Sequence, residues 1–240
     1  MTVGDPNLEV SEKAIYTMQE EGVDLIELGV PFSDPAADGP VIQRADERAL
    51  AQGVDIFKVF ELVRKIRNNV EVPMVFLLYY NVMVQYGIEK FFKCCQETGV
   101  DGLIIPDLPY EESDEIKEYT EKYGVYQISL VSPTSKDRIK NIAKDAKGFL
   151  YCISSLGVTG EKSSFVTNFD EFVGTIKKYT DVPACVGFGV SNGEQVKELT
   201  KYFDGAIVGS AIVKSIATGE SVEERINNLR EKIKDLKSGL

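Results

Sequence analysis

The sequence predicts an α/β protein with the (β/α)8 TIM-barrel fold, built as a single domain over residues 1–240. The first observation is that short aliphatic runs alternate with longer amphipathic segments along the whole chain, which is typical of βα units. The second is that these runs are almost wholly apolar, as expected of parallel strands buried on both faces. The third is their number. Seven full strands and a stub at "MTV" fit the eight units of a barrel.

The elements of the first half follow from the spacing of apolar residues and from the residues that end each run. Residues 8–22 form an amphipathic segment and predict a helix, which leads into a strand at 23–29, "VDLIELG". Residues 56–69 repeat the amphipathic pattern and lead into the strand at 73–80, "PMVFLLYY". Gly, Pro or Asp punctuates the ends of these strands, as it does in the second half.

The same alternation continues to the C-terminus. Further helices are predicted at 88–99, 112–124, 135–146, 169–180, 193–203 and 221–237. Further strands are predicted at 100–107, 125–131, 148–155, 183–189 and 205–209, and "GSAIVKS" opens a helix directly after the last of them. A doubly wound sheet is the alternative fold. It needs a glycine-rich turn after its first strand, and "TVGDPN" lacks that pattern.

Charge and composition exclude several classes of function. Lys and Arg number 27 and Asp and Glu 38, so the net charge of −11 repels the phosphates of nucleic acids and anionic membranes. No apolar run reaches the roughly 18 residues of a membrane span, and "MTVGDPNLEV" has no signal-peptide pattern. The four cysteines form no C-x-x-C pair, which favours reduced, buried thiols. We therefore expect a cytoplasmic protein.

The chain contains no histidine, and this restricts the chemistry further. A Ser-His-Asp triad, a Cys-His pair and a His-bearing zinc site are all excluded. Proton transfer must then fall to carboxylates, Tyr, Lys or Cys. No cluster of possible ligands supports a metal site.

Two acids stand where a barrel carries its chemistry, at the carboxyl ends of strands. Glu27 lies near the carboxyl end of an apolar strand, where low polarity would raise its pKa toward neutrality, as proton transfer needs. The alternative role for Glu27 is that of a buried structural residue. Asp38 lies on the following loop, which three prolines restrain. Asp34 in the same loop has the alternative role of forming a turn.

Three late loops are rich in small residues: "SSLGVTGEKSS", "VGFGVSNGE" and "IVGSAIVKS". Glycine lets backbone N–H groups approach an anion, and a phosphate held by the loops after strands 7 and 8 recurs in barrels. Neither a dinucleotide fingerprint nor a P-loop is present. The loops therefore predict a small phosphorylated substrate, with tight turns as the alternative.

"ELGVPFSDPAADGP" closely resembles the signature of the tryptophan synthase α subunit family, and "TVGDP", "IIPDLPYEES", "SSLGVTG", "GFGVS" and "GSAIVK" extend the resemblance over the whole chain. The resemblance implies a lyase that cleaves indole-3-glycerol phosphate into indole and glyceraldehyde 3-phosphate. Glu27 matches the family's acid/base and Asp38 the carboxylate that contacts the indole nitrogen. Tyr151 matches a site tyrosine that positions the substrate or relays a proton. The implied substrate-binding residues are Leu77, Ile104, Thr159, Gly160, Ile207, Phe188, Gly189, Gly209 and Ser210.

The resemblance also implies a partner, a β subunit that uses pyridoxal phosphate and receives the indole within an α2β2 complex, whereas this chain needs no cofactor. Asp34, Pro35, Asn81 and Pro109 match the family's interface loops. Compared with the family, the chain begins inside the first strand, so we expect a truncated strand 1 and no preceding helix. A stand-alone indole-releasing lyase and a non-catalytic chain that activates a β subunit remain as alternatives.

Overall fold

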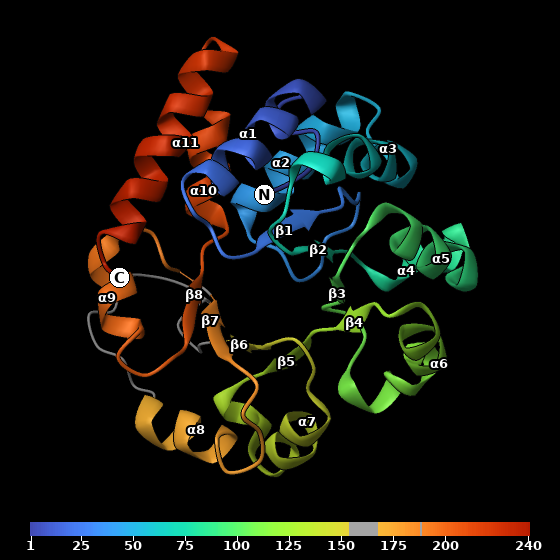
Figure 1. Ribbon diagram of the computed structural model, residues 1–240, viewed down its shortest axis with the longest axis vertical. Helices are drawn as coiled ribbons and strands as arrows, with labels where there is room; N and C mark the ends of the chain where they lie inside the picture. Colours follow the sequence, from blue (N-terminus) through green and yellow to red (C-terminus); the bar gives the residue numbers. More distant parts are fainter. Residues whose placement is uncertain (154–167, 188) are drawn as a thin grey trace. The chain divides into compact units, whose positions relative to one another are not determined.

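The computed structural model describes residues 1–153, 168–187 and 189–240 (Figure 1). The chain divides into two compact units, each described below by itself. The first comprises residues 1–127 and 210–234, and the second residues 128–209 and 235–240. Each unit contains a four-stranded parallel sheet. That residues 1–240 form a single domain stays a prediction.

The sheet of the first unit has the strand order β1-β2-β3-β4. Its strands are β1 (Ile26–Gly29), β2 (Met74–Leu77), β3 (Gly102–Ile104) and β4 (Tyr126–Gln127). The predicted stub lies beside β1, because Thr2 forms a parallel bridge with Gly29 and the Val3 N–H donates to the Gly29 carbonyl oxygen at 2.9 Å. β1 therefore has a neighbour on each side, and its carboxyl end leads into the loop that carries Asp38.

The helices of the first unit are α1 (Leu8–Glu20), α2 (Pro40–Ala51), α3 (Ile56–Ile66), α4 (Tyr80–Tyr86), α5 (Ile88–Thr98), α6 (Asp114–Tyr123), α10 (Ser210–Ala217) and most of α11 (Val222–Lys237). The rings of Phe60 on α3, Phe76 on β2 and Phe91 on α5 meet edge to face, with centroids 5.4 and 5.3 Å apart. All three rings are buried, and such contacts fix the helices against the sheet.

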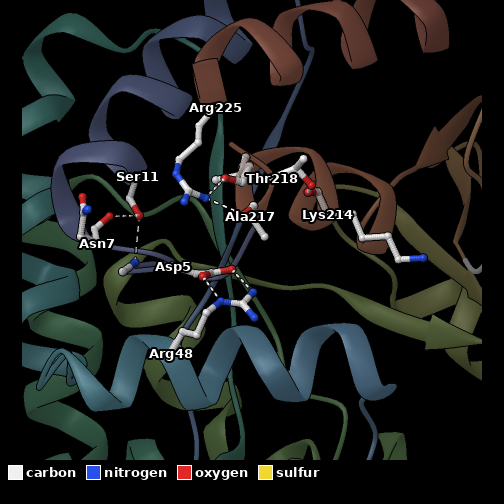
Figure 2. Close-up of polar contacts among 10 residues, drawn as sticks. Asp5, Asn7, Ser11, Arg48, Lys214, Ala217, Thr218 and Arg225 are labelled. Atoms are coloured by element: carbon white, nitrogen blue, oxygen red, sulfur yellow. Dashed lines mark hydrogen bonds and ion pairs between the residues drawn. The ribbon is translucent and has the colours of Figure 1, made fainter. Parts of the chain in front are cut away.

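The helix α10 packs against α2 (Figure 1). Its carboxyl end is closed by Arg225 of α11, whose guanidinium donates to the carbonyl oxygens of Ile216 at 3.0 Å and Ala217 at 2.6 Å (Figure 2). These are carbonyls that a helix end leaves without intrahelical partners, and a cation there also complements the helix dipole. Arg225 thereby joins α11 to the end of α10.

The second unit has the strand order β5-β6-β7-β8. Its strands are β5 (Ser129–Val131), β6 (Leu150–Ile153), β7 (Ala184–Gly187) and β8 (Gly205–Ile207), and its helices are α7 (Ile139–Asp145), α8 (Phe169–Ile176) and α9 (Gly193–Leu199). Phe169 and Phe172 of α8 pack on the Phe203 ring, with centroids 5.3 and 6.4 Å apart. Within the described residues of the chain, no helix is long and apolar enough to cross a bilayer.

The structure differs from the sequence-based expectation in three places. Two helices, α2 and α4, were not predicted, and Asn81 lies in the first turn of α4 rather than in a loop after a strand. The strand predicted at 125–131 is divided. Tyr126 and Gln127 pair with β3, whereas Ser129–Val131 pairs with β6. The division follows from pairing partners, which a local pattern does not contain.

Candidate active site

Glu27 lies in β1 between Ile26 and Leu28, whose side chains are buried. Glu27 itself is half-buried, because it lies on the face of the strand opposite to Ile26 and Leu28. Burial is the largest influence on the carboxyl and raises its pKa above the ordinary value; the Met1 amino group acts in the opposite direction, and the charge of Asp38 raises the pKa further. The structure thus brings the two predicted acids, 11 positions apart in the sequence, within electrostatic reach of each other.

Asp38 is held by Tyr79, which follows β2. The Tyr79 hydroxyl donates to the Asp38 carboxylate at 2.7 Å and accepts from the Ala37 N–H at 2.8 Å. The Phe32 ring stacks on the Tyr79 ring, with centroids 5.1 Å apart. Burial raises the pKa of Asp38, and the Tyr79 hydrogen bond partly offsets the rise. Burial and the bond to Asp38 raise the pKa of the Tyr79 hydroxyl, which therefore remains a donor.

A third acid, Asp5, is neutralised by an ion pair. Arg48 of α2 donates from Nε and Nη2 to the two carboxylate oxygens of Asp5 at 2.7 and 2.8 Å (Figure 2). The Asp5 side chain is 2% exposed and the Arg48 side chain 40% exposed. Such a two-bond contact fixes both direction and distance. It ties the segment after the first-strand stub to α2.

Asp46, also on α2, is buried, and no cation among the described residues forms an ion pair with it. Burial and the charge of Asp38 raise its pKa to about 7, and hydrogen-bond donors from Thr2 and the Phe32 backbone act in the opposite direction. Its carboxyl therefore changes charge near neutral pH. No group of three His, Cys, Asp or Glu side chains in the described part of the chain is arranged to hold a metal ion.

The predicted apolar wall of the substrate site occupies strand ends. Leu77 of β2 and Ile104 of β3 are partners in the parallel register of the first unit. Ile207 ends β8 in the second unit and is half-buried. Tyr151 also lies in the second unit, on β6, and its ring covers Gly187 so closely that an added Cβ there would lie 2.5 Å from the ring. Gly187 is thus the residue that leaves space for Tyr151.

The predicted phosphate residues lie at turns after β7 and β8. Gly189 has a φ of +75°, in the left-handed region that favours glycine. Gly209 is exposed, with no atom of the described residues within 4 Å of an added Cβ, and Ser210 begins α10. The end of a strand therefore meets the N-terminus of a helix, where backbone N–H groups are unsatisfied. Thr159, Gly160 and Phe188 lie outside the described residues.

The four residues predicted to meet a partner all belong to the first unit. Asp34, Asn81 and Pro109 are exposed, and Pro35 is half-buried. Pro35 also shapes the loop, because its carbonyl oxygen accepts from the Asp38 N–H at 3.3 Å. Asp107, another acid that follows a strand, has a local role. Its carboxylate accepts from the Tyr80 N–H at 2.9 Å and caps α4.

Sequence reasoning missed Tyr79 and Asp46. Tyr79 was read as part of an apolar strand, although its place at the carboxyl end of that strand was a signal. Asp46 falls on the apolar face of α2 with Ile42, Ala45 and Ala49, and an acid at such a position is a second signal. That signal becomes visible only once the helix α2 is known, because the face on which Asp46 lies is defined by the helix.

The family model described as tryptophan synthase alpha chain matches residues 1–240. The chain belongs to the tryptophan synthase alpha chain family. Among curated members of this family, that of Alkaliphilus metalliredigens is 47% identical over 99% of this chain and 91% of its own length. That of Thermoanaerobacter sp. (strain X514) is 46% identical over 100% and 92%. The resemblance predicted from the motifs is therefore confirmed.

Solved structures of this family agree with the fold. A tryptophan synthase structure from Mycobacterium tuberculosis matches with a TM-score of 0.88 at 34% identity, covering 100% of this chain and 90% of that one. Tryptophan synthase subunit alpha from Campylobacter jejuni matches with a TM-score of 0.88 at 40% identity, covering 98% and 93%. With two four-stranded parallel sheets and intervening helices, these likenesses confirm the predicted (β/α)8 class.

Proposed function

We propose that this tryptophan synthase alpha chain uses Glu27 and Asp38 to cleave indole-3-glycerol phosphate into indole and glyceraldehyde 3-phosphate, in the last steps of L-tryptophan biosynthesis. Family membership supports the reaction. The observation that carries the assignment of residues is the pair of partly buried carboxyls at the carboxyl end of β1, both with raised pKa values. Groups whose pKa values are shifted by burial and by a neighbouring charge are typical of proton-transfer sites.

Cleavage of the carbon–carbon bond needs two proton transfers. Protonation of indole C3 gives an indolenine whose nitrogen carries positive charge. Removal of the proton from the adjacent glycerol hydroxyl then forms the aldehyde C=O, the C3–carbon bond breaks, and its electrons restore the indole ring. One proton enters and one leaves, so a single carboxyl of intermediate pKa serves as acid and then as base. Glu27 takes this role.

Asp38 contributes charge rather than proton transfer. An ionised carboxylate next to the indole nitrogen stabilises the positive charge that develops there, and a site with little water strengthens that interaction. Tyr79 holds the carboxylate with a bond of 2.7 Å, so little reorganisation is needed when the charge appears. Leu77 and Ile104 form one apolar wall of the indole site, and Ile207 contributes to another. Tyr151 positions the substrate.

The phosphate of the substrate is bound by backbone N–H groups of the late loops. The left-handed turn at Gly189, the open Gly209 and the N-terminus of α10 at Ser210 support this proposal. Thr159, Gly160 and Phe188 complete the set of substrate residues.

Members of this family act with a beta subunit, and we propose an α2β2 complex in the cytoplasm whose β subunit carries pyridoxal phosphate. The exposed positions of Asp34, Asn81 and Pro109 support a docking face in the first unit. Indole would then pass from this chain to the β subunit, while this chain itself needs no cofactor.

The experiment is an indole-release assay on the wild type, Glu27→Gln and Asp38→Asn, with and without a cognate β subunit. Glu27→Gln keeps the size of the side chain but cannot exchange the proton, and we expect a loss of at least ~10²-fold in kcat with binding of glycerol phosphate retained. Asp38→Asn should lower the rate by a smaller factor than Glu27→Gln does, and the loss should lie mainly in kcat. Glu47→Gln, an exposed acid on α2, is the control.

Three results would contradict the proposal in different ways. Near-normal turnover by folded Glu27→Gln removes Glu27 from the mechanism. An inactive wild type that still stimulates a β subunit favours the non-catalytic alternative. Indole release without stimulation by, or co-elution with, a β subunit favours the stand-alone lyase.

A further inference from the structure

The Asp38 carboxylate has one oxygen that is held and one that is open. The Tyr79 hydroxyl donates to Oδ2 at 2.7 Å. Among the described residues, no other hydrogen bond and no ion pair reaches this carboxylate. Asp38 is half-buried, so its open oxygen, Oδ1, is the one that can accept a hydrogen bond from a bound ligand.

The direction of the Tyr79 hydrogen bond is fixed by a second contact. The hydroxyl accepts from the Ala37 N–H at 2.8 Å, and a backbone N–H can only donate. The single proton of the hydroxyl is therefore left for Asp38, whose Oδ2 acts as an acceptor. Because Ala37 and Asp38 are neighbours in the chain, the two bonds close a ring through Tyr79. This ring fixes the direction of the Asp38 side chain.

Tyr79 is itself held in place. It is 5% exposed, and the Phe32 ring stacks on its ring with centroids 5.1 Å apart. The preceding residue is tied to β3, because the Leu78 N–H donates to the Ile104 carbonyl oxygen at 3.0 Å. A buried and stacked ring directly after β2 gives Asp38 a partner whose position is set by the sheet.

The main chain of Asp38 is held by α2. The Gln43 side-chain amide donates to the Asp38 carbonyl oxygen at 2.8 Å. The Gln43 N–H donates to the Gly39 carbonyl oxygen at 3.1 Å, as in a regular helical turn. The side chain of Asp38 is thus held from the end of β2 and its main chain from the start of α2.

We propose that Tyr79 and Gln43 are positioning residues that present one oxygen of Asp38, Oδ1, to the nitrogen of the indole ring. The indole nitrogen carries one hydrogen, so one correctly aimed acceptor is sufficient. Holding that acceptor before the substrate arrives reduces the reorganisation that the reaction requires. This inference rests on the proposed function, because it concerns the same reaction. Neither residue touches the reacting atoms, and both act through Asp38.

The first test is indole release by Tyr79→Phe, which keeps the stacked ring and removes both hydrogen bonds. We expect kcat to fall about ten- to thirtyfold, because the lost bond has a charged acceptor, while KM changes less than about threefold. Tyr80→Phe is the matched control, since the Tyr80 hydroxyl also donates to a carboxylate, that of Glu115, at 2.6 Å. Its kcat should stay within about twofold of wild type. Equal effects of the two substitutions would overturn the proposal, as would a loss that lies mainly in KM.

A double-mutant cycle separates positioning from packing. An Asp38→Ala background has no carboxylate to orient, so Tyr79→Phe should lower kcat there by less than about twofold. The same loss as in the wild-type background would mean that Tyr79 acts elsewhere, and the proposal would then be wrong.

Gln43→Leu tests the main-chain contact. It keeps the size of the side chain and removes the donor, and we expect a smaller loss in kcat of about three- to fivefold, because this bond is exposed. Glu47→Leu introduces the same side chain one turn later on α2, at another exposed position, and should stay within about twofold of wild type. Equal rates of the two variants would remove Gln43 from the proposal.

A further readout does not depend on catalysis. Tyr79→Phe should raise the pKa of the Asp38 carboxyl, followed by carbon NMR of labelled protein, because the lost donor favours the ionised form. The Ala37 amide should also lose hydrogen-exchange protection in Tyr79→Phe and keep it in Tyr80→Phe. An unchanged Asp38 titration together with unchanged Ala37 protection overturns the positioning role. If the wild type releases no indole, the proposed reaction fails, and these two measurements alone then test whether Tyr79 holds Asp38.

Discussion

Replacing Arg48 by Met should destabilise the protein far more than a typical surface mutation. Arg48 makes two bonds to Asp5, at 2.7 and 2.8 Å, and the Asp5 side chain is 2% exposed. Met preserves much of the apolar stem of the side chain but removes both donors. The variant would therefore leave a buried carboxylate without its partner.

The expected cost follows from the exposure of the two side chains. Removing one partner of a fully buried ion pair costs about 3–5 kcal/mol. Because 40% of the Arg48 side chain is exposed, water can partly replace the guanidinium, and we expect about 2–3 kcal/mol. This is a large share of a net stability of ~5–15 kcal/mol. Urea unfolding followed by circular dichroism measures it.

Two further variants isolate the cause. Arg44→Met changes an exposed arginine on the same helix and should shift the free energy of unfolding by less than about 0.5 kcal/mol. Asp5→Asn removes the charge that Arg48 neutralises, so Arg48→Met should cost less than about 1 kcal/mol in that background. Equal costs of Arg48→Met in the two backgrounds would refute the reasoning, because the loss would then come from packing alone.

Two other predictions concern stability. The pKa of Asp46 is about 7 in the folded protein, against an ordinary 3.8, so between these values the folded protein keeps a proton that the unfolded chain has lost. The free energy of unfolding is therefore highest at low pH and falls as the pH rises through 7. From pH 5.5 to 8.5 the free energy of unfolding of the wild type should fall by about 2 kcal/mol more than that of Asp46→Asn. Urea unfolding measures both, and the same pH dependence in the two proteins would refute this prediction. Gly187→Ala places a Cβ 2.5 Å from the Tyr151 ring and should cost about 1–3 kcal/mol. Gly174 on α8 has no atom of the described residues within 4 Å of an added Cβ, so Gly174→Ala should raise the free energy of unfolding by about 0.5–1 kcal/mol. Equal effects of the two substitutions on urea unfolding would contradict the account of Gly187.

Most elements could be predicted because their signals are local. The apolar run of β2 and the amphipathic spacing of α3 each lie within one contiguous segment. α2 was missed because it begins at Pro40, directly after the proline-rich loop, although Pro is favoured in the first turn of a helix. α4 could not be found this way, since its N-terminus is capped by Asp107, 27 positions away.

The residues of the candidate site also divide into those with a local signal in the sequence and those that depend on distant contacts. Glu27 and Asp38 stand out in the sequence because acids interrupt an apolar strand and a proline-rich loop. The role of Tyr79 depends on a hydrogen bond to a residue 41 positions away, and the environment of Asp46 depends on Thr2, Phe32 and Asp38 together. Local patterns identified residues with unusual chemistry, whereas the contacts that hold and tune them exist only in the folded chain.

Ion pairing separates the four acids described above into two groups. Asp5 has the guanidinium of Arg48, so its charge is neutralised in the resting protein. Among the ion pairs of the described residues, no Lys or Arg side chain pairs with Glu27, Asp38 or Asp46, and burial raises the pKa of each. Ionised carboxyls in such surroundings are costly until a positive charge arrives. The proposed reaction supplies one on the indole nitrogen only as C3 is protonated, so the unpaired carboxylate of Asp38 interacts more strongly with the transition state than with the substrate. Interactions of that kind accelerate the chemical step, and a permanent cation beside Asp38 would remove the advantage.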